Sequence, residues 1–509
     1  MLKPHLLNDK IEIIVIISII ITVFAFLLLS GTLVSGYHFQ DDHEIIRIKD
    51  DLKTSTVLSV SKKWITEDIH GTRRFRPLYY FHRVIETKIF GSDFLLWSLY
   101  TGALACLTMI FFFLAMRNLK YNTGSSIVFM IVAFAGSQMA VWWRLGPNET
   151  IGITFFALSF YFMSRSIFGR GNIINNSLFI LFLILSSLSK ESFIIIIPGV
   201  LFFKIYMEKI ANNITLRDAL QKNILLLVPI IVIVFELAYI VSGVGTIQAF
   251  DSGIHSKLIG CYNCVIILVK TYPYLGFVGC VLLLANFILK NSIFELKWLP
   301  VILALLILIP NIVLYSRGGI WERYLLPSSV GFGFVVASIL NGIKSDFLKA
   351  KIIIYLSVLI SLSPLMLTSY NNARKFAEEG AALKSLLGGI RQNYIEGTNV
   401  LAVVDPINFY EQSYSLKTYL FLEQQITLYG YPLIKSGHDE SYNSLINGWK
   451  GYFSGVQYED LKSLPNLIIF LDTRLVKDFF NITKIDQEKY SQVLGISSSF
   501  ALLKLNPHL

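Results

Sequence analysis

The chain has 509 residues, of which 54% are hydrophobic and only 15% are charged, with a mean hydropathy of +0.60 and a formal net charge of +10. A soluble domain carries about 25% charged residues, so this composition excludes an ordinary soluble protein and predicts an integral membrane protein. The basic residues fall mostly in short links between apolar segments, which excludes a nucleic-acid-binding face, and four cysteines are too few for a disulfide scaffold.

Apolar segments long enough to cross a bilayer recur through the first three quarters of the chain. A span needs about 20 mainly apolar residues, or fewer where protein shields the helix. The first segment is longer than the roughly 7 to 15 apolar residues of a cleaved signal peptide, so we expect it to remain as a span. We predict eleven spans, at residues 11–34, 94–116, 125–143, 151–168, 177–189, 192–208, 224–243, 272–289, 298–315, 325–342 and 351–369.

The basic residues between these spans predict the orientation. With a cytoplasmic N-terminus, the inner links carry fifteen Lys and Arg residues and the short outer links carry six. Basic residues concentrate on the cytoplasmic side of membrane proteins. We therefore expect a multi-pass protein of the bacterial plasma membrane, with its N-terminus inside and its C-terminus outside.

The first outer loop, residues 35–92, departs from this charge rule. It begins with the acidic pair Asp41 and Asp42, ends with an arginine-rich stretch that includes Arg76, and holds ten basic residues in all. Apolar residues at helical spacing predict amphipathic helices on the membrane surface over 43–52 and 77–89. Charge is costly near hydrocarbon unless it is paired or hydrated, so this loop is a candidate working site.

Three other outer links, residues 143–150, 189–192 and 317–324, also carry charged side chains. The predicted orientation places all three on the same side as the first loop, so we expect the four segments to line one cavity. The residues that would line a substrate pocket there are Arg144, Glu149, Glu191, Glu322 and Tyr324.

The composition changes after residue 370. Residues 372–394 read as a helix, and apolar runs at 400–404, 467–471 and 500–505 read as buried strands, with a helical pattern over 410–425. We therefore divide the chain into a transmembrane domain, 1–370, and an extracytoplasmic α/β domain, 371–509.

These charged groups suit the transfer of a sugar from a lipid-linked phosphate. An aspartate acting as general base would take the proton from an acceptor hydroxyl, which attacks the anomeric carbon and inverts it. Cations stabilise the charge that grows on the departing phosphate, and arginine does so with two parallel hydrogen bonds. We assign Asp41 and Asp42 as candidate bases; the candidate phosphate ligands are Arg73, Arg74, Arg76, Lys190 and Arg323.

The motifs Phe39-Gln40-Asp41-Asp42 and Phe75-Arg76-Pro77-Leu78 resemble those of GT-C glycosyltransferases, in particular the protein O-mannosyltransferase-like members. The resemblance covers roughly residues 1–345 and implies a GT-C-like polytopic helical fold. It also implies a polyprenyl- or dolichyl-phosphate sugar donor, catalysis on the extracytoplasmic side, and a base in the first loop. The acceptor, whether glycan, lipid or protein, stays open.

Simpler explanations exist for several of these residues. Asp41 and Asp42 could cap the helix that begins at His43, and the arginines could bind lipid head groups. His43 beside the two aspartates is a weak metal signal, so no metal or other cofactor is assigned, although a divalent metal stays open. Cys261 and Cys264 form a lone CxxC, which indicates a thiol pair or local disulfide more than a zinc site.

Two other functions remain as alternatives. A flippase or transporter of lipid-linked oligosaccharides would place charges near the midplane of its spans, whereas here the charges gather at one face. An O-antigen polymerase or ligase would act on the same side of the membrane, but by analogy it would carry its large polar loop late in the chain.

The orientation can be tested by labelling a single thiol. A cysteine at position 440, in a protein whose four native cysteines have been replaced, should react with a membrane-impermeant reagent in intact cells. The predicted topology places this position outside the cell. Reaction only after permeabilisation would reverse the orientation.

Overall fold

The computed structural model describes most of the chain. The described residues are 3–506 except 72–73, 169–171, 244–253, 272–297, 316–321, 344–347, 435–442, 462 and 497–499. The predicted span 272–289 lies outside them. Two compact units are present. Unit 1 comprises Met1–Leu33, Ser61–Arg83 and Leu96–Arg374, and unit 2 comprises Val34–Val60, Val84–Leu95 and Lys375–Leu509.

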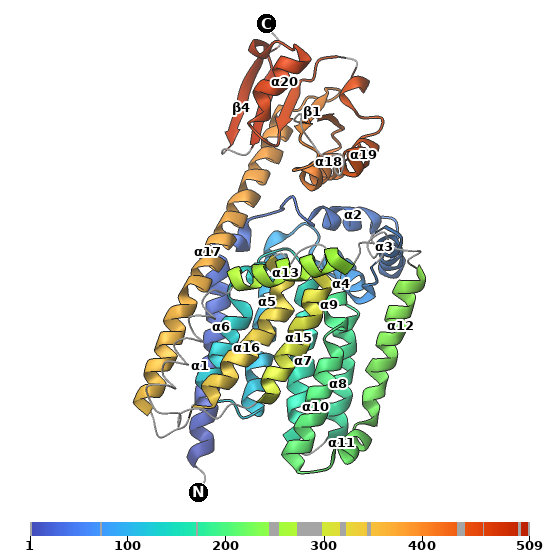
Figure 1. Ribbon diagram of the computed structural model, residues 1–509. Helices are drawn as coiled ribbons and strands as arrows, with labels where there is room; N and C mark the ends of the chain where they lie inside the picture. The colour runs from blue at the N-terminus through green and yellow to red at the C-terminus, as the bar shows by residue number, and fades with distance from the viewer. Residues whose placement is uncertain are drawn as a thin grey trace. The chain divides into compact units, whose positions relative to one another are not determined.

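Helices dominate both units (Figure 1). They are α1 (Lys3–Leu29), α2 (His43–Asp51), α3 (Val57–Gly71), α4 (Pro77–Phe90), α5 (Phe94–Asn118), α6 (Thr123–Phe134), α7 (Asn148–Phe168), α8 (Asn172–Ser187), α9 (Glu191–Ile194), α10 (Ile197–Asn212), α11 (Leu216–Lys222), α12 (Leu227–Gly243), α13 (Ile254–Thr271), α15 (Trp298–Tyr315), α16 (Leu326–Asn341), α17 (Leu348–Asn393), α18 (Tyr410–Gln424), α19 (Asn443–Tyr452) and α20 (Leu475–Thr483). A polytopic, mainly helical protein is thus confirmed.

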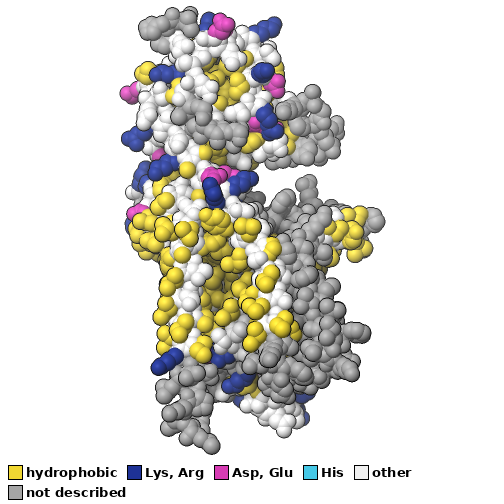
Figure 2. All heavy atoms as spheres, turned by 90° about the vertical axis from the view of Figure 1, so that its left-hand side faces the viewer, with side chains coloured by type: hydrophobic (Ala, Val, Ile, Leu, Met, Phe, Trp, Pro, Cys, Tyr) yellow, Lys and Arg dark blue, Asp and Glu magenta, His cyan; other side chains and the backbone are white. Residues whose placement is uncertain are grey.

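Among the described residues, five helices are long and apolar enough to cross a membrane, or six if α11 and α12, bent by 71°, count as one span. The five lie at predicted spans; they are Lys10–Leu29, Phe94–Asn118, Asn148–Phe168, Arg323–Asn341 and Ile352–Asn393. The shorter apolar helices α6, α8 and α15 occupy three further predicted positions. Figure 2 shows hydrophobic side chains gathered in a broad band on the face that it displays. The total of eleven spans stays a prediction.

Close aromatic packing holds the helices of unit 1 together. Phe112 and Phe160 pack with their ring centroids 6.1 Å apart, and Phe334 of α16 lies 4.8 Å from Phe129 of α6. Gly152 lets α7 approach the segment after α8, because a Cβ at this position would lie 2.5 Å from the ring of Phe193. Packing of this density fixes the ends of α7, α8 and α16, where the polar links begin.

Two of the predicted loop helices are confirmed. Helix α2 buries Ile45, Ile46 and Ile48, as its apolar spacing indicates, and α4 begins at Pro77, a residue suited to a first helical turn. Helix α3 was not predicted, because the sequence there reads as a polar segment. It carries Asp68, which is buried.

The C-terminal part of unit 2 contains a five-stranded sheet of order β2-β1-β3-β5-β4. The strands are β1 (Val400–Val404), β2 (Leu428–Pro432), β3 (Leu467–Phe470), β4 (Tyr490–Ile496) and β5 (Phe500–Leu505). Strand β1 pairs in parallel with β2 and β3, whereas β5 runs antiparallel to β3 and β4. The predicted strands β1, β3 and β5 and helix α18 are confirmed, and β2 and β4 were missed.

Successive residues of the buried strands point to opposite faces of the sheet and belong to two hydrophobic cores. One core includes Val400 and Ile469 with Trp449 of α19, and the other includes Val403 and Phe470. Helix α17 runs unbroken for 46 residues and buries its last turns against the first of these cores. The sequence placed a domain boundary at residue 370, inside this continuous helix.

A buried polar network ties α11 to α10. The Lys204 ammonium donates to Glu208 at 2.7 Å and to Asn223 at 2.6 Å, and Asn223 also donates to Glu208. All three side chains are buried. The network keeps an ion pair satisfied inside the protein and fixes the bend before α12.

Removing one member of this network should destabilise the protein. Lys204→Met leaves the Glu208 carboxylate buried without its cation, so we expect a loss of about 3 to 5 kcal/mol in the free energy of unfolding. The double variant Lys204→Met/Glu208→Leu should recover much of this loss, because no unpaired charge remains. Thermal unfolding of the solubilised protein measures both. Equal stability of the single variant and the wild type would contradict a stabilising network.

Candidate functional site

Arg76 is held by Asp68. The guanidinium donates two hydrogen bonds to the carboxylate, at 3.0 and 2.9 Å, and both side chains are buried. Helix α3 supplies Asp68, and Arg76 immediately precedes α4. Burial alone would lower the pKa of Arg76, but nearby Glu191, Tyr80 and Asp68 raise it well above its ordinary value, so the group stays charged. This pair therefore fixes the chain where the loop turns into α4.

Glu149, in the first turn of α7, binds two cations. Its Oε1 accepts a hydrogen bond from Lys190 and lies 3.4 Å from the guanidinium of Arg323. Glu149 and Lys190 are both buried, whereas the Arg323 side chain is 22% exposed. Tyr324 lies against the same cations, with its ring centroid 4.3 Å from the Lys190 ammonium and 5.6 Å from the Arg323 guanidinium. Three of the predicted outer links are thus brought together.

Glu191 interacts electrostatically both with Arg76 of the Arg76–Asp68 pair and with Lys190 of the group around Glu149. Its carboxylate lies 3.6 Å from the guanidinium of Arg74, whose side chain is 46% exposed. Burial alone would raise the pKa of Glu191, but Arg76, Lys190 and Arg74 hold it below its ordinary value. Glu191 therefore stays ionised at neutral pH. Together these residues form what we call the basic cluster: Asp68, Arg74, Arg76, Glu149, Lys190, Glu191 and Arg323.

Arg83 stabilises the turn that precedes Glu149 of the basic cluster. Its buried guanidinium donates hydrogen bonds to the carbonyl oxygens of Leu145 and Gly146 and stacks on Trp97, 5.0 Å from the ring centroid. Gly146 has a φ of +58°, which glycine tolerates without a Cβ clash. Arg83 thereby fixes the turn that leads into α7 and to Glu149.

The acidic pair lies in unit 2, in the segment before α2. Asp42 is buried and does not cap α2, since its side chain makes no cap hydrogen bond. Its Oδ2 instead accepts from the backbone N–H of His38 at 2.9 Å and lies 3.3 Å from His38 Nδ1. Asp41 is partly exposed and has a φ of +64°. For Asp42, the capping explanation is therefore ruled out.

His38 shows where one proton must lie. Its Nε2 is 3.0 Å from the carbonyl oxygen of Phe376, which can only accept, so Nε2 carries a hydrogen. The contact between Nδ1 and Asp42 is then a hydrogen bond only if a further proton lies between them. His38 thus contacts both the Phe376 carbonyl oxygen and the Asp42 carboxylate.

The remaining predicted residues are placed as follows. Arg144 lies half-buried in the turn before α7, and Glu322 begins the 3-10 helix Glu322–Leu325, but its side chain is outside the described residues, as is Arg73. Within the described ranges, no group of three or more His, Cys, Asp or Glu side chains could hold a metal ion. Cys261 and Cys264 lie in α13, and the Cys264 thiol donates to the carbonyl oxygen of Tyr315 at 3.3 Å.

Sequence analysis missed Asp68, Arg83 and His38. Asp68 and Arg83 lie inside helices whose polar faces look solvent-exposed in the sequence, and only the fold shows that they are buried. His38 lies four residues before Asp42. The sequence does not show that the backbone between them turns so that their side chains meet.

Comparison with known proteins supports the fold. The crystal structure of ArnT from Cupriavidus metallidurans in the apo state matches with a TM-score of 0.54 and 11% sequence identity, over 95% of this chain and 97% of that chain. ArnT has a polytopic GT-C fold. At this identity the likeness shows a shared polytopic GT-C fold. No protein-family model and no curated protein sequence matches the chain.

Loss of the buried Arg76–Asp68 pair should destabilise the protein more than loss of the partly exposed Arg74 side chain. Asp68→Ala leaves Arg76 buried without its partner, and we expect a loss of about 3 to 5 kcal/mol. Arg74→Ala removes a partly exposed side chain and should change stability by less than about 1 kcal/mol. Thermal unfolding of the two purified variants gives the comparison. Similar losses in both would show that burial of the Arg76–Asp68 pair does not determine its contribution.

Proposed function

We propose that this protein transfers a sugar from a polyprenyl-phosphate-linked donor to an acceptor hydroxyl on the extracytoplasmic face, with inversion of the anomeric carbon. The GT-C fold supports this class of reaction. Within that class, the sequence resemblance to protein O-mannosyltransferase-like members supports a hexose as the transferred sugar. The acceptor is a glycan, a lipid or a protein.

The charge balance of the basic cluster carries the proposal. Its described ion pairs join four cations to three carboxylates, which leaves one positive charge for an anionic ligand. Arg74 and Arg323 are the most exposed of these cations and so are best able to meet a phosphate. Lys190 and Arg76 add charge from a buried position. Arg73 would add a further cation.

Two carboxylate oxygens in this cluster suit sugar hydroxyls. The Oε2 atoms of Glu149 and Glu191 are buried and have no hydrogen-bond partner among the described residues. A buried acceptor without a donor is costly, so a hydroxyl that donates to it gains affinity. Arg144, Glu322 and Tyr324 would complete the pocket around the sugar.

An aspartate of the first loop would act as the base. It would remove the proton of the acceptor hydroxyl as the oxygen forms its bond to the anomeric carbon and the lipid phosphate departs. General-base help of this kind contributes about 100- to 10,000-fold.

Substitution of the aspartates tests the proposal. Asp41→Asn or Asp42→Asn should reduce sugar transfer by at least about 100-fold, because an amide cannot accept the proton. Mass analysis of surface glycans from cells that lack the gene and carry each variant gives the readout, with transfer from polyprenyl-phosphate hexoses by purified protein as a second one.

Asp50→Asn is the matched control. Asp50 lies in α2 and forms an exposed pair with Lys53, so its loss should leave transfer unchanged. Full activity in both Asp41→Asn and Asp42→Asn would overturn the assignment of these aspartates as the base.

A further inference from the structure

Helix α18 presents a polar stripe to the acidic loop. Glu411, Ser415, Tyr419 and Glu423 follow one another at intervals of four residues, so they lie on one side of the helix. Each of the four bonds to the segment that carries the acidic pair, residues 37–49. Such a continuous run of contacts points to a specific interface between this helix and the loop.

The two central residues hold the backbone on the N-terminal side of the acidic pair. The Ser415 hydroxyl donates to the carbonyl oxygen of Phe39, and the Tyr419 hydroxyl donates to that of His38. Ser415 and Tyr419 are both buried. Their hydroxyls therefore replace hydrogen bonds that a regular element would have supplied to this irregular segment.

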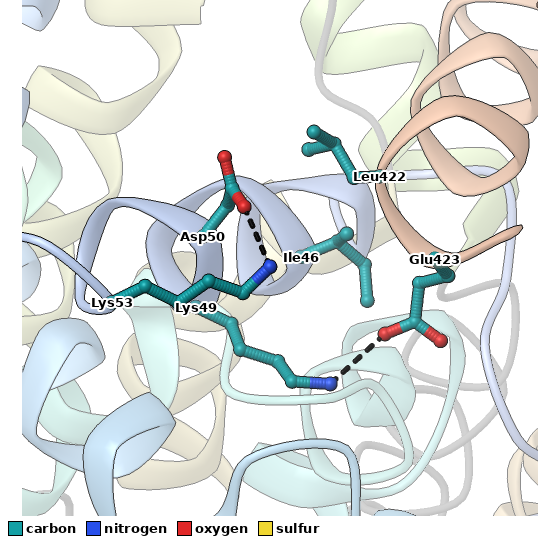
Figure 3. A pocket seen from close by; sticks show the side chains of 6 residues that line it. All are labelled: Ile46, Lys49, Asp50, Lys53, Leu422 and Glu423. Carbon is teal, nitrogen blue, oxygen red and sulfur yellow. Dashed lines mark hydrogen bonds and ion pairs between the residues drawn. The ribbon is translucent and has the colours of Figure 1, made fainter. Parts of the chain in front are cut away.

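The outer residues of the stripe extend the contact in both directions. The backbone N–H of Asp41 donates to Glu411 at 3.2 Å, and the Lys49 ammonium donates to Glu423 at 3.1 Å. Figure 3 shows Lys49 of α2 and Glu423 of α18 pointing toward each other beside a surface pocket. Contacts with α18 thus extend along the loop from His38, before the acidic pair, to Lys49 near the end of α2.

Aromatic contacts add to the same interface. The rings of Tyr37 and Tyr419 stack with centroids 5.1 Å apart, and the ring of Phe39 meets that of Phe500 in β5 at 5.4 Å. His43 packs edge-on against Tyr414 at 4.7 Å. These contacts leave the loop little room to shift along α18.

Helix α17 restrains the loop from another direction. The His38 ring stacks on Phe376 with centroids 3.5 Å apart, and a Cβ at Gly380 would lie 2.5 Å from His38 Nε2. His38 in turn contacts the Asp42 carboxylate. The orientation of Asp42 therefore depends on helix residues more than 330 positions away in the sequence.

We propose that the C-terminal α/β domain is a positioning device for the catalytic loop, with Ser415 and Tyr419 as positioning residues for Asp41 and Asp42. This inference rests on the proposed function of the two aspartates. The contribution of the domain is to hold the base in a reactive geometry. A misplacement of about 1 Å is enough to cost on the order of 100-fold in rate.

Removal of the two hydroxyls tests this role. Ser415→Ala/Tyr419→Phe keeps the rings and the packing but deletes the bonds to Phe39 and His38. In the full-length protein we expect faster amide hydrogen exchange over residues 38–43. We also expect kcat for transfer from a polyprenyl-phosphate hexose to fall by about 10- to 100-fold with an unchanged KM for the donor.

Phe421→Ala is the control on the same helix, because this side chain is 55% exposed and has no part in the stripe. It should leave both exchange and kcat at wild-type values. Thermal unfolding of each variant separates a local change from a global loss of structure, and a fall in kcat only in proportion to unfolded protein would overturn the inference.

The outcomes distinguish this inference from the proposed function. Unchanged exchange over 38–43, or faster exchange with a wild-type kcat, would overturn the positioning role while leaving the aspartates as the base. Retained transfer in Asp41→Asn/Asp42→Asn would instead remove the proposed role of the aspartates as the base, whatever the hydroxyl variants do.

Discussion

Compensation of buried charge is the constraint on which unit 1 depends. Glu149 is inside the protein, and its carboxylate accepts from Lys190 while Arg323 lies close by. Either charge alone would cost several kcal/mol in such a place, so the three links that carry them must meet. The ends of α7, α8 and α16 are thereby fixed relative to one another. An apolar bundle would pack without these groups.

Unit 2 depends in a similar way on hydrogen bonds to backbone groups that no helix or strand satisfies. The segment before α2 is irregular, and side-chain hydroxyls from α18 satisfy its carbonyl oxygens. The sheet supports α18, whose Leu416 and Leu420 belong to the core that also includes Val400 and Trp449. Strand order and helix packing are in this way connected to the position of a short acidic loop. The proposed positioning role of the C-terminal domain rests on this connection.

The sequence predicted those features that depend on local periodicity. The apolar spacing in α2 and α4 and the buried runs of β1, β3 and β5 were sufficient for their assignment. Strand β2 was missed because Leu428–Pro432 alternates weakly and ends in proline, and β4 because Ser491, Gln492 and Gly495 interrupt its apolar residues. Some apolar segments continue beyond the helix that they contain. The predicted span 125–143, for example, extends past the end of α6 at Phe134.

The site was predictable in its residue types and not in its pairing. Arg74, Arg76, Glu149, Lys190 and Arg323 were all chosen from charge in outer links, and the fold joins them in one cluster. Their closest partners could not be read from the chain, since Asp68 pairs with Arg76 only once α3 has folded. Ser415 and Tyr419 reach the loop across more than 370 positions, a separation that no local pattern spans.

The left-handed backbone at Asp41 limits which residues this position can accept. Most side chains clash there, and only glycine, asparagine and aspartate adopt the conformation readily. Of these three, aspartate alone has a carboxylate side chain that can accept a proton. In the proposed mechanism, conformation and acid–base chemistry therefore select the same residue, and the substitutions that the backbone would most easily allow are those that would abolish proton transfer.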